Sequence, residues 1–113
     1  REIIERGRTL LAVDYNAAVD AVPALRAALG PLFDRFDAIV TPAAAGQAPR
    51  DLTVTGSPIF CTIWTLLGTP AVSLPLLRGD AGLPIGVQLV AQKGDDARLL
   101  RTARWLVERT AGA

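Results

Sequence analysis

The stretch from Gly68 to Gln92, GTPAVSLPLLRGDAGLPIGVQLVAQ, constrains the fold more than any other part of the chain. Two apolar runs, 71–77 and 85–92, flank a polar, glycine-containing segment at 78–84 that can turn the chain back on itself. The pattern therefore predicts the two strands of an antiparallel hairpin. Within the second run, Ile85, Val87, Leu89 and Ala91 alternate onto one face, which we expect to lie on the core.

Helical periodicity and stop signals surround this hairpin. Apolar residues at helical spacing and terminal glycines predict helices over 2–6 (ended by Gly7), 12–29, 57–67 and 95–109. Pro23 should kink or split the second of these, and Ser57 followed by Pro58 is typical of a helix N-cap. A further short strand is predicted over 37–42. Residues 1–113 are thus expected to form one α/β unit of about three strands and three to four helices, without an internal boundary.

The composition suggests that this unit faces another polypeptide. Half of the residues are hydrophobic and only 20% are charged, which is apolar for a chain of 113 residues. A sheet of three strands also leaves at least one unpaired edge, which natural proteins normally cover or pair. We therefore expect an association partner, and self-association into a homo-oligomer if no other partner is present.

Charge and residue counts exclude several classes of function. Twelve basic and eleven acidic residues give a net charge of +1, so nucleic acid is not an expected partner. The absence of histidine and the single cysteine argue against a metal, a haem or any other cofactor and against an internal disulfide, and favour a reducing, cytoplasmic location. No apolar run reaches membrane-spanning length, and the charged opening lacks a secretion signal. An opening without Met suggests a truncated N-terminus.

The candidate nucleophiles each have a structural explanation that we favour over a catalytic one. Ser57 fits a helix cap, and Lys93 would have to be buried and neutral to activate Ser73 across the hairpin. Cys61 lacks any histidine that could deprotonate it and is expected to pack as a small apolar group. No residue of the chain is therefore predicted to be catalytic.

Six fragments of the chain carry a resemblance to one enzyme family. They are Tyr15, 36–42 (FDAIVTP), Ala48-Pro49, Phe60 with 68–71 (GTPA), Leu74-Pro75 and 83–89 (LPIGVQL). Their order and spacing resemble the C-terminal region of the amidase signature family, which includes bacterial amidases and the A subunit of glutamyl-tRNA amidotransferase. The resemblance covers nearly the whole chain.

This resemblance implies an α/β fold around a large mixed sheet and hydrolysis of carboxamide C–N bonds. In the family a serine nucleophile, a second serine joined through a cis peptide and a lysine perform the reaction. All three lie upstream of the region seen here, so the chain alone is predicted to be inactive. Its implied partners are the N-terminal remainder of the same amidase and a small-molecule amide substrate.

The resemblance further implies that this region lines the acyl side of the substrate pocket, through Thr41, Pro42, Phe60, Cys61 and Trp64. An equally weighted alternative is that Phe60 and Trp64, one helical turn apart, are simply core residues. For the whole chain, the alternative is a non-catalytic, self-associating module derived from the amidase fold.

Overall fold

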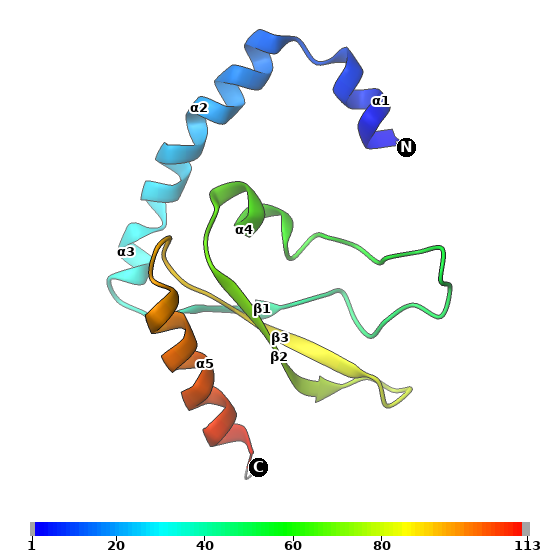
Figure 1. Cartoon of the computed structure of the whole chain (residues 1–113), viewed down its shortest axis with the longest axis vertical. Helices are drawn as coiled ribbons and strands as arrows, with labels where there is room; N and C mark the ends of the chain where they lie inside the picture. The colour runs from blue at the N-terminus through cyan, green and yellow to red at the C-terminus, as the bar shows by residue number, and fades with distance from the viewer. Residues whose placement is uncertain (1, 112–113) are drawn as a thin grey trace.

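The three predicted strands form one antiparallel sheet in a computed structural model that describes residues 2–111. They are β1 (Ile39–Pro42), β2 (Ala71–Arg78) and β3 (Pro84–Val90), in the order β1-β3-β2 (Figure 1). The predicted hairpin of β2 and β3 is confirmed, and the chain is an α/β protein as expected. The last strand in the sequence is the central one, because β1 pairs with its other side.

Both faces of β3 are buried toward its C-terminal end. Leu89 and Ala91 pack with Leu99 and Ala103 of helix α5 (Asp96–Thr110), which confirms the predicted core face. The opposite face was expected to be the more exposed one. There, Val90 is fully buried and Gln88 is 6% exposed, and the segment leading into helix α4 contacts Gln88 through the carbonyl of Phe60.

Two helices form an N-terminal arm that leaves the sheet (Figure 1). Helix α1 spans Glu2–Thr9, so the prediction that Gly7 ends it is wrong. Helix α2 spans Ala12–Ala28 and continues through Pro23. Since α2 is exposed along its length, water can hydrate the carbonyl that loses its partner at a proline. The short helix α3 (Gly30–Phe33) follows, and Phe33 is buried.

Helix α4 spans Thr62–Leu67 and begins later than the predicted 57–67. The carbonyl of Pro58 accepts hydrogen bonds from the N–H groups of Cys61 and Thr62, which closes a separate turn before the helix. Ser57 lies in front of this turn and does not cap α4, whose N-cap residue is Cys61. The predicted stop is confirmed, since Gly68 adopts a left-handed φ of 62° at the C-cap.

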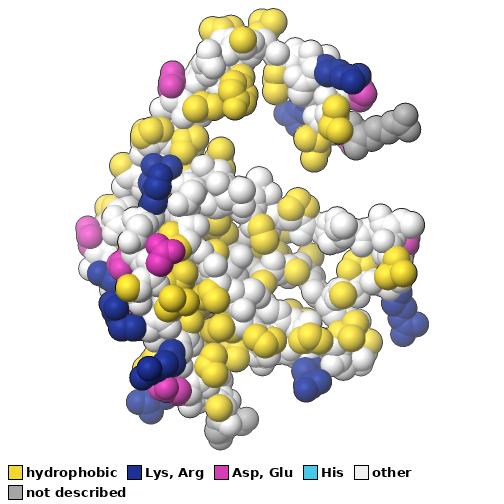
Figure 2. All heavy atoms as spheres, viewed as in Figure 1, with side chains coloured by type: hydrophobic (Ala, Val, Ile, Leu, Met, Phe, Trp, Pro, Cys, Tyr) yellow, Lys and Arg dark blue, Asp and Glu magenta, His cyan; other side chains and the backbone are white. Residues whose placement is uncertain are grey.

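The described residues form a flat and open body. The principal extents are 53 × 41 × 16 Å, and the radius of gyration is 17.0 Å where a compact chain of this length has about 13 Å. The accessible surface of 8657 Å² exceeds by about 2,700 Å² that of a typical folded monomer of the same mass. Figure 2 shows hydrophobic side chains spread over the arm and along the lower part of the body. Among residues 2–111, no helix combines the length and the apolar character needed to span a membrane.

Candidate functional site

The buried amide of Gln88 joins three separate segments of the chain. Its Nε2 donates to Thr41 Oγ1 of β1 at 3.0 Å and to the carbonyl of Phe60 at 2.9 Å. Its Oε1 lies 3.9 Å from the Sγ of Cys61, whose thiol also lies 3.5 Å from the carbonyl of Ala43. We call Thr41, Phe60, Cys61 and Gln88 the Gln88 cluster. It brings together three of the five predicted pocket residues.

The orientation of the Gln88 amide follows from its partners. A main-chain carbonyl can only accept a hydrogen bond, so the atom facing Phe60 must be the NH₂ nitrogen. The oxygen then faces Cys61, whose thiol can donate a weak hydrogen bond. Burying an amide without partners would cost about 1–3 kcal/mol, and here both ends of the amide are engaged.

The strand register places polar side chains in one row across the sheet. Gln88 is opposite Thr41 on one neighbouring strand and opposite Ser73 on the other. Cross-strand partners share a face, so all three belong to the face opposite α5. Gly86, two residues before Gln88, also belongs to this face. A Cβ there would collide with Ser73 Oγ and with the Cβ of Ala43, so only glycine fits without movement.

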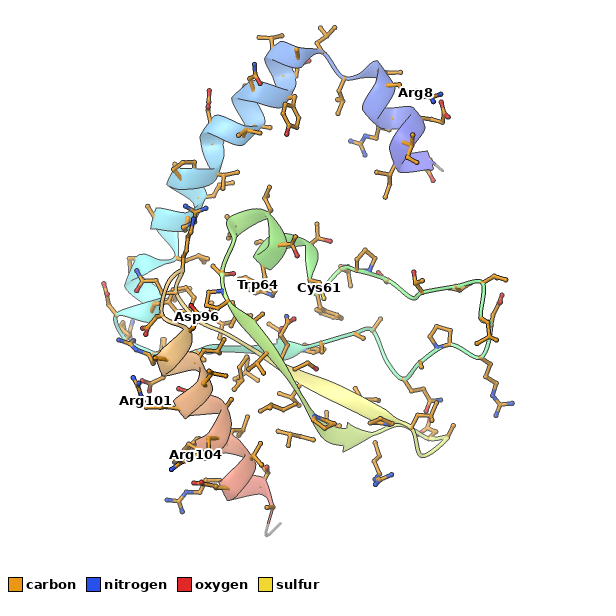
Figure 3. All side chains as sticks on the ribbon, viewed as in Figure 1. Arg8, Cys61, Trp64, Asp96, Arg101 and Arg104 are labelled. Carbon is orange, nitrogen blue, oxygen red and sulfur yellow. The ribbon has the colours of Figure 1, made fainter. Side chains whose placement is uncertain are left out.

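The two remaining predicted pocket residues lie outside this cluster. Pro42 is exposed and pairs with Val87, so it belongs to the face of the sheet opposite Thr41 and Gln88. Trp64 is half-buried in α4, three residues after Cys61. In Figure 3 the side chains of Cys61 and Trp64 lie between α4 and the sheet. The structure thus gathers Thr41, Phe60 and Cys61 around one polar group, while Trp64 lies three residues further along the chain and Pro42 on the opposite face of the sheet.

Gln88 was not among the site residues predicted from the sequence. The alternation along β3 placed Gln88 on the less apolar face. Such a pattern shows which face of a strand is buried but does not show whether the other face is covered as well. The small Gly86 and the apolar Val90, both on the face of Gln88, were the signals that this second face is covered as well.

The hydroxyls and the amine considered as catalytic groups lie apart from one another. Ser57, Ser73 and Lys93 are all exposed. Pro70, three residues before Ser73, accepts a hydrogen bond from Ala91, two residues before Lys93, so the register separates the serine and the lysine along the hairpin. Within the described part of the chain these two residues form no hydrogen bond with each other.

An open groove of about 640 Å³ lies on another part of the surface, between α5 and the link from α3 to β1. Arg98 crosses its floor, donating to the carbonyl of Phe33 at 3.1 Å and pairing with Asp95 at 2.9 Å. Its walls carry both signs of charge, with Arg35 and Arg101 near Asp34 and Asp37. None of these residues belongs to the Gln88 cluster.

A sequence profile of the amidase family matches residues 1–100. The chain belongs to the amidase signature family. Its relatives include a fatty acid amide hydrolase of Medicago truncatula, 32% identical over 93% of this chain and 19% of the relative. The A subunit of the glutamyl-tRNA(Gln) amidotransferase of Geobacter metallireducens is 35% identical over 95% of this chain and 21% of that subunit.

The amidase signature fold is also present in the coordinates. A crystal structure of an amidase superposes with a TM-score of 0.81 and 30% sequence identity, over 96% of this chain and 28% of the amidase. The chain therefore spans about a fifth of the length of the curated relatives it matches, and it is a portion of an amidase signature hydrolase.

Proposed function

We propose that this chain is the C-terminal part of an amidase that hydrolyses carboxamide C–N bonds, and that it supplies a sheet and one wall of the acyl pocket. The reaction follows the family's Ser-Ser-Lys mechanism, with the two serines and the lysine in the remainder of the enzyme. The observation that carries this proposal is the match of nearly the whole chain to a quarter of a solved amidase.

The open surface supports a large intramolecular partner. Its excess of about 2,700 Å² is roughly three times the 800 Å² that each partner buries in a standard protein interface. Much of it is apolar, including the side chains of Ile3, Leu11, Val13 and Tyr15 on the arm, each more than 60% exposed. An arm that buries none of its own residues needs contacts from elsewhere to hold its position.

The pocket role falls to Thr41, Pro42, Phe60, Cys61 and Trp64, the residues that the family resemblance implies. They present a hydroxyl, a thiol and apolar surface, with no ionised side chain among them. Such a wall suits the uncharged acyl part of a small amide and leaves charge stabilisation to other residues.

A chimera tests this function. Residues 1–113 would replace the matching part of the structurally similar amidase, and hydrolysis of fatty and aromatic carboxamides would be followed by release of ammonia. We expect turnover from the chimera and none from the isolated chain. A chimera whose nucleophilic serine is changed to alanine is the matched control and should be inactive.

Two results would contradict the proposal. One is a well-folded chimera that hydrolyses no amide, and the other is turnover by the isolated chain that disappears in Ser73→Ala or Lys93→Met. The sequence preceding Arg1 in the gene gives an independent test, because the proposal requires a Gly- and Ser-rich segment and a lysine there.

A further inference from the structure

We propose that Gln88 is a positioning residue that sets the distance between β1 and the Phe60–Cys61 segment, and thereby the width of the pocket wall. The functional consequence of this inference is that Gln88 affects which acyl groups fit the pocket, and that consequence rests on the proposed function. The structural part of the inference, the coupling of the two segments through one amide, is testable on the chain alone.

The hydrogen-bond partners of the Gln88 amide are far apart in the sequence, so this amide links segments that local structure does not hold together. Thr41 and Phe60 lie 47 and 28 residues before Gln88. Thr41 is also the partner of Gln88 in the β1–β3 ladder, whereas Phe60 meets it through a single side-chain hydrogen bond. The connection between them, 43–61, contains no helix or strand and is exposed over most of its length. A loop of this kind does not fix the distance between its own ends, so that distance depends on what both ends contact.

Gln88 itself is held firmly. It lies on the central strand, with register partners on both sides, and its side chain is more than nine-tenths buried. Its NH₂ group reaches in two directions at once, to the hydroxyl of β1 and to the carbonyl before α4. One planar amide therefore contacts both segments, and the Cys61 thiol near the carbonyl of Ala43 adds a second link between them.

This role differs from that of a core residue. Apolar side chains of similar size in the Gln88 position would fill the same space, at a cost in stability because the Phe60 carbonyl loses its donor. They would lose the directional contacts. The expected effect of such a change is a looser pocket wall with a folded sheet.

The reactivity of Cys61 reports the position of the segment, because Cys61 is the only cysteine of the chain and is half-buried beside Gln88. Alkylation by iodoacetamide would be followed by mass spectrometry on the wild-type chain, Gln88→Met and Thr41→Val. We expect both variants to react about five- to tenfold faster, the change that follows from losing hydrogen bonds of ordinary net strength. The matched control is Gln92→Met, at an exposed position just beyond β3, and it should react at the wild-type rate.

A double-mutant cycle separates positioning from general destabilisation. If Thr41 acts through Gln88, Thr41→Val adds nothing to the rate of Gln88→Met. Additive effects, or a Gln88→Met rate equal to that of wild type, overturn the inference. Circular dichroism identifies a variant that has lost its fold, and the cycle would then be run with Gln88→Glu, which keeps the oxygen but loses the NH₂ donor.

The chimera provides the functional test of this inference. Gln88→Met should change the ratio of kcat/KM between a bulky and a small carboxamide, because the wall that selects between them has moved. An unchanged ratio would contradict the pocket role of Gln88. The chimera could be inactive while Gln88→Met and Thr41→Val have non-additive effects on the alkylation rate of Cys61. That result would contradict the proposed function and leave the positioning role supported.

Discussion

The guanidinium of Arg26 donates from Nε to the main-chain carbonyl of Leu67 at 2.7 Å and joins α2 to the last turn of α4. Carbonyls in the last turn of a helix have no partner within that helix, and a positive charge is favourable there. Arg98 makes the equivalent contact with the carbonyl of Phe33 at the end of α3. Arg26 thus attaches the helical arm to α4, and Arg98 attaches α3 to α5.

Arg26→Ala should release α2 from α4. A hydrogen bond to a charged donor contributes about 1.5–3 kcal/mol, and α2 buries no residue that could compensate. We expect a lower free energy of unfolding in urea and faster amide exchange across α2. Arg101→Ala is the control, since Arg101 has no hydrogen bond or ion pair among the described residues and should change stability by under about 0.5 kcal/mol. Equal effects of the two substitutions would contradict the role of Arg26.

Gly86→Ala should destabilise the sheet by about 1–3 kcal/mol, the usual cost of overpacking. The added methyl group meets Ser73 Oγ and Ala43 Cβ. Gly46→Ala is the matched control because nothing lies within 4 Å of a Cβ there. Thermal unfolding measures both. Ser73→Ala in the Gly86→Ala background should restore part of the loss, and purely additive effects would show that the hydroxyl is not the obstacle.

Gly68→Ala should cost about 1 kcal/mol, because a residue with a Cβ is strained at the left-handed φ of 62°. Asparagine tolerates this conformation better than alanine, so Gly68→Asn should cost less. Chemical denaturation measures the free energy of unfolding of both variants and shows which one is more stable. Equal stability of the two would indicate that the C-cap of α4 moves to another conformation.

The pKa of Asp51 is lowered below its ordinary value, because its carboxylate accepts hydrogen bonds from the hydroxyl and then the N–H of Thr53. A lowered folded pKa stabilises this turn above the unfolded pKa, and the contribution disappears as pH falls through the folded pKa. Thr53→Val removes only the hydroxyl donor, so the pKa should rise part of the way back. NMR titration of the Asp51 carboxyl checks this, with Thr53→Ser as the control that keeps the low value.

The isolated chain should self-associate at micromolar concentration, because its apolar arm and outer strand edges lack partners among the described residues. Light scattering coupled to size exclusion measures the mass. Val13→Lys combined with Tyr15→Lys should shift the population toward monomer, whereas Asp20→Lys on the same helix should not. A clean monomer of the unmodified chain would refute the prediction.

The hairpin could be predicted because strand alternation and turn residues are local properties. Ala71–Arg78 and Pro84–Val90 differ from the predicted strands by at most two residues at either end. The start of α4 could not be predicted from Ser57-Pro58, since a cap signal and an isolated turn use the same residues. The Pro58 carbonyl closes that turn before the helix begins.

The pocket residues were predicted from the family resemblance. Which of them lie together around one side chain is known only from the structure. Thr41 and Phe60 both reach the amide of Gln88, and no local pattern encodes contacts over 28 or 47 residues. The burial of Gln88 also depends on a segment that is distant in sequence. Periodicity describes one strand at a time and carries no information about what covers its second face.

The strand order β1-β3-β2 has a consequence for how the chain acquires its structure. Among the described strands β1 pairs with β3 alone, so it cannot join the sheet before β3 has been made. Closing the local hairpin requires a short loop, whereas adding β1 requires a loop of more than forty residues, which is the slower event. On a ribosome, Ile39–Pro42 would emerge well before β3, its partner among the described strands, and would stay unpaired until then. Mutations that slow hairpin formation would lengthen the time during which β1 is unpaired. They would therefore raise aggregation during synthesis more than they lower the stability of the folded chain.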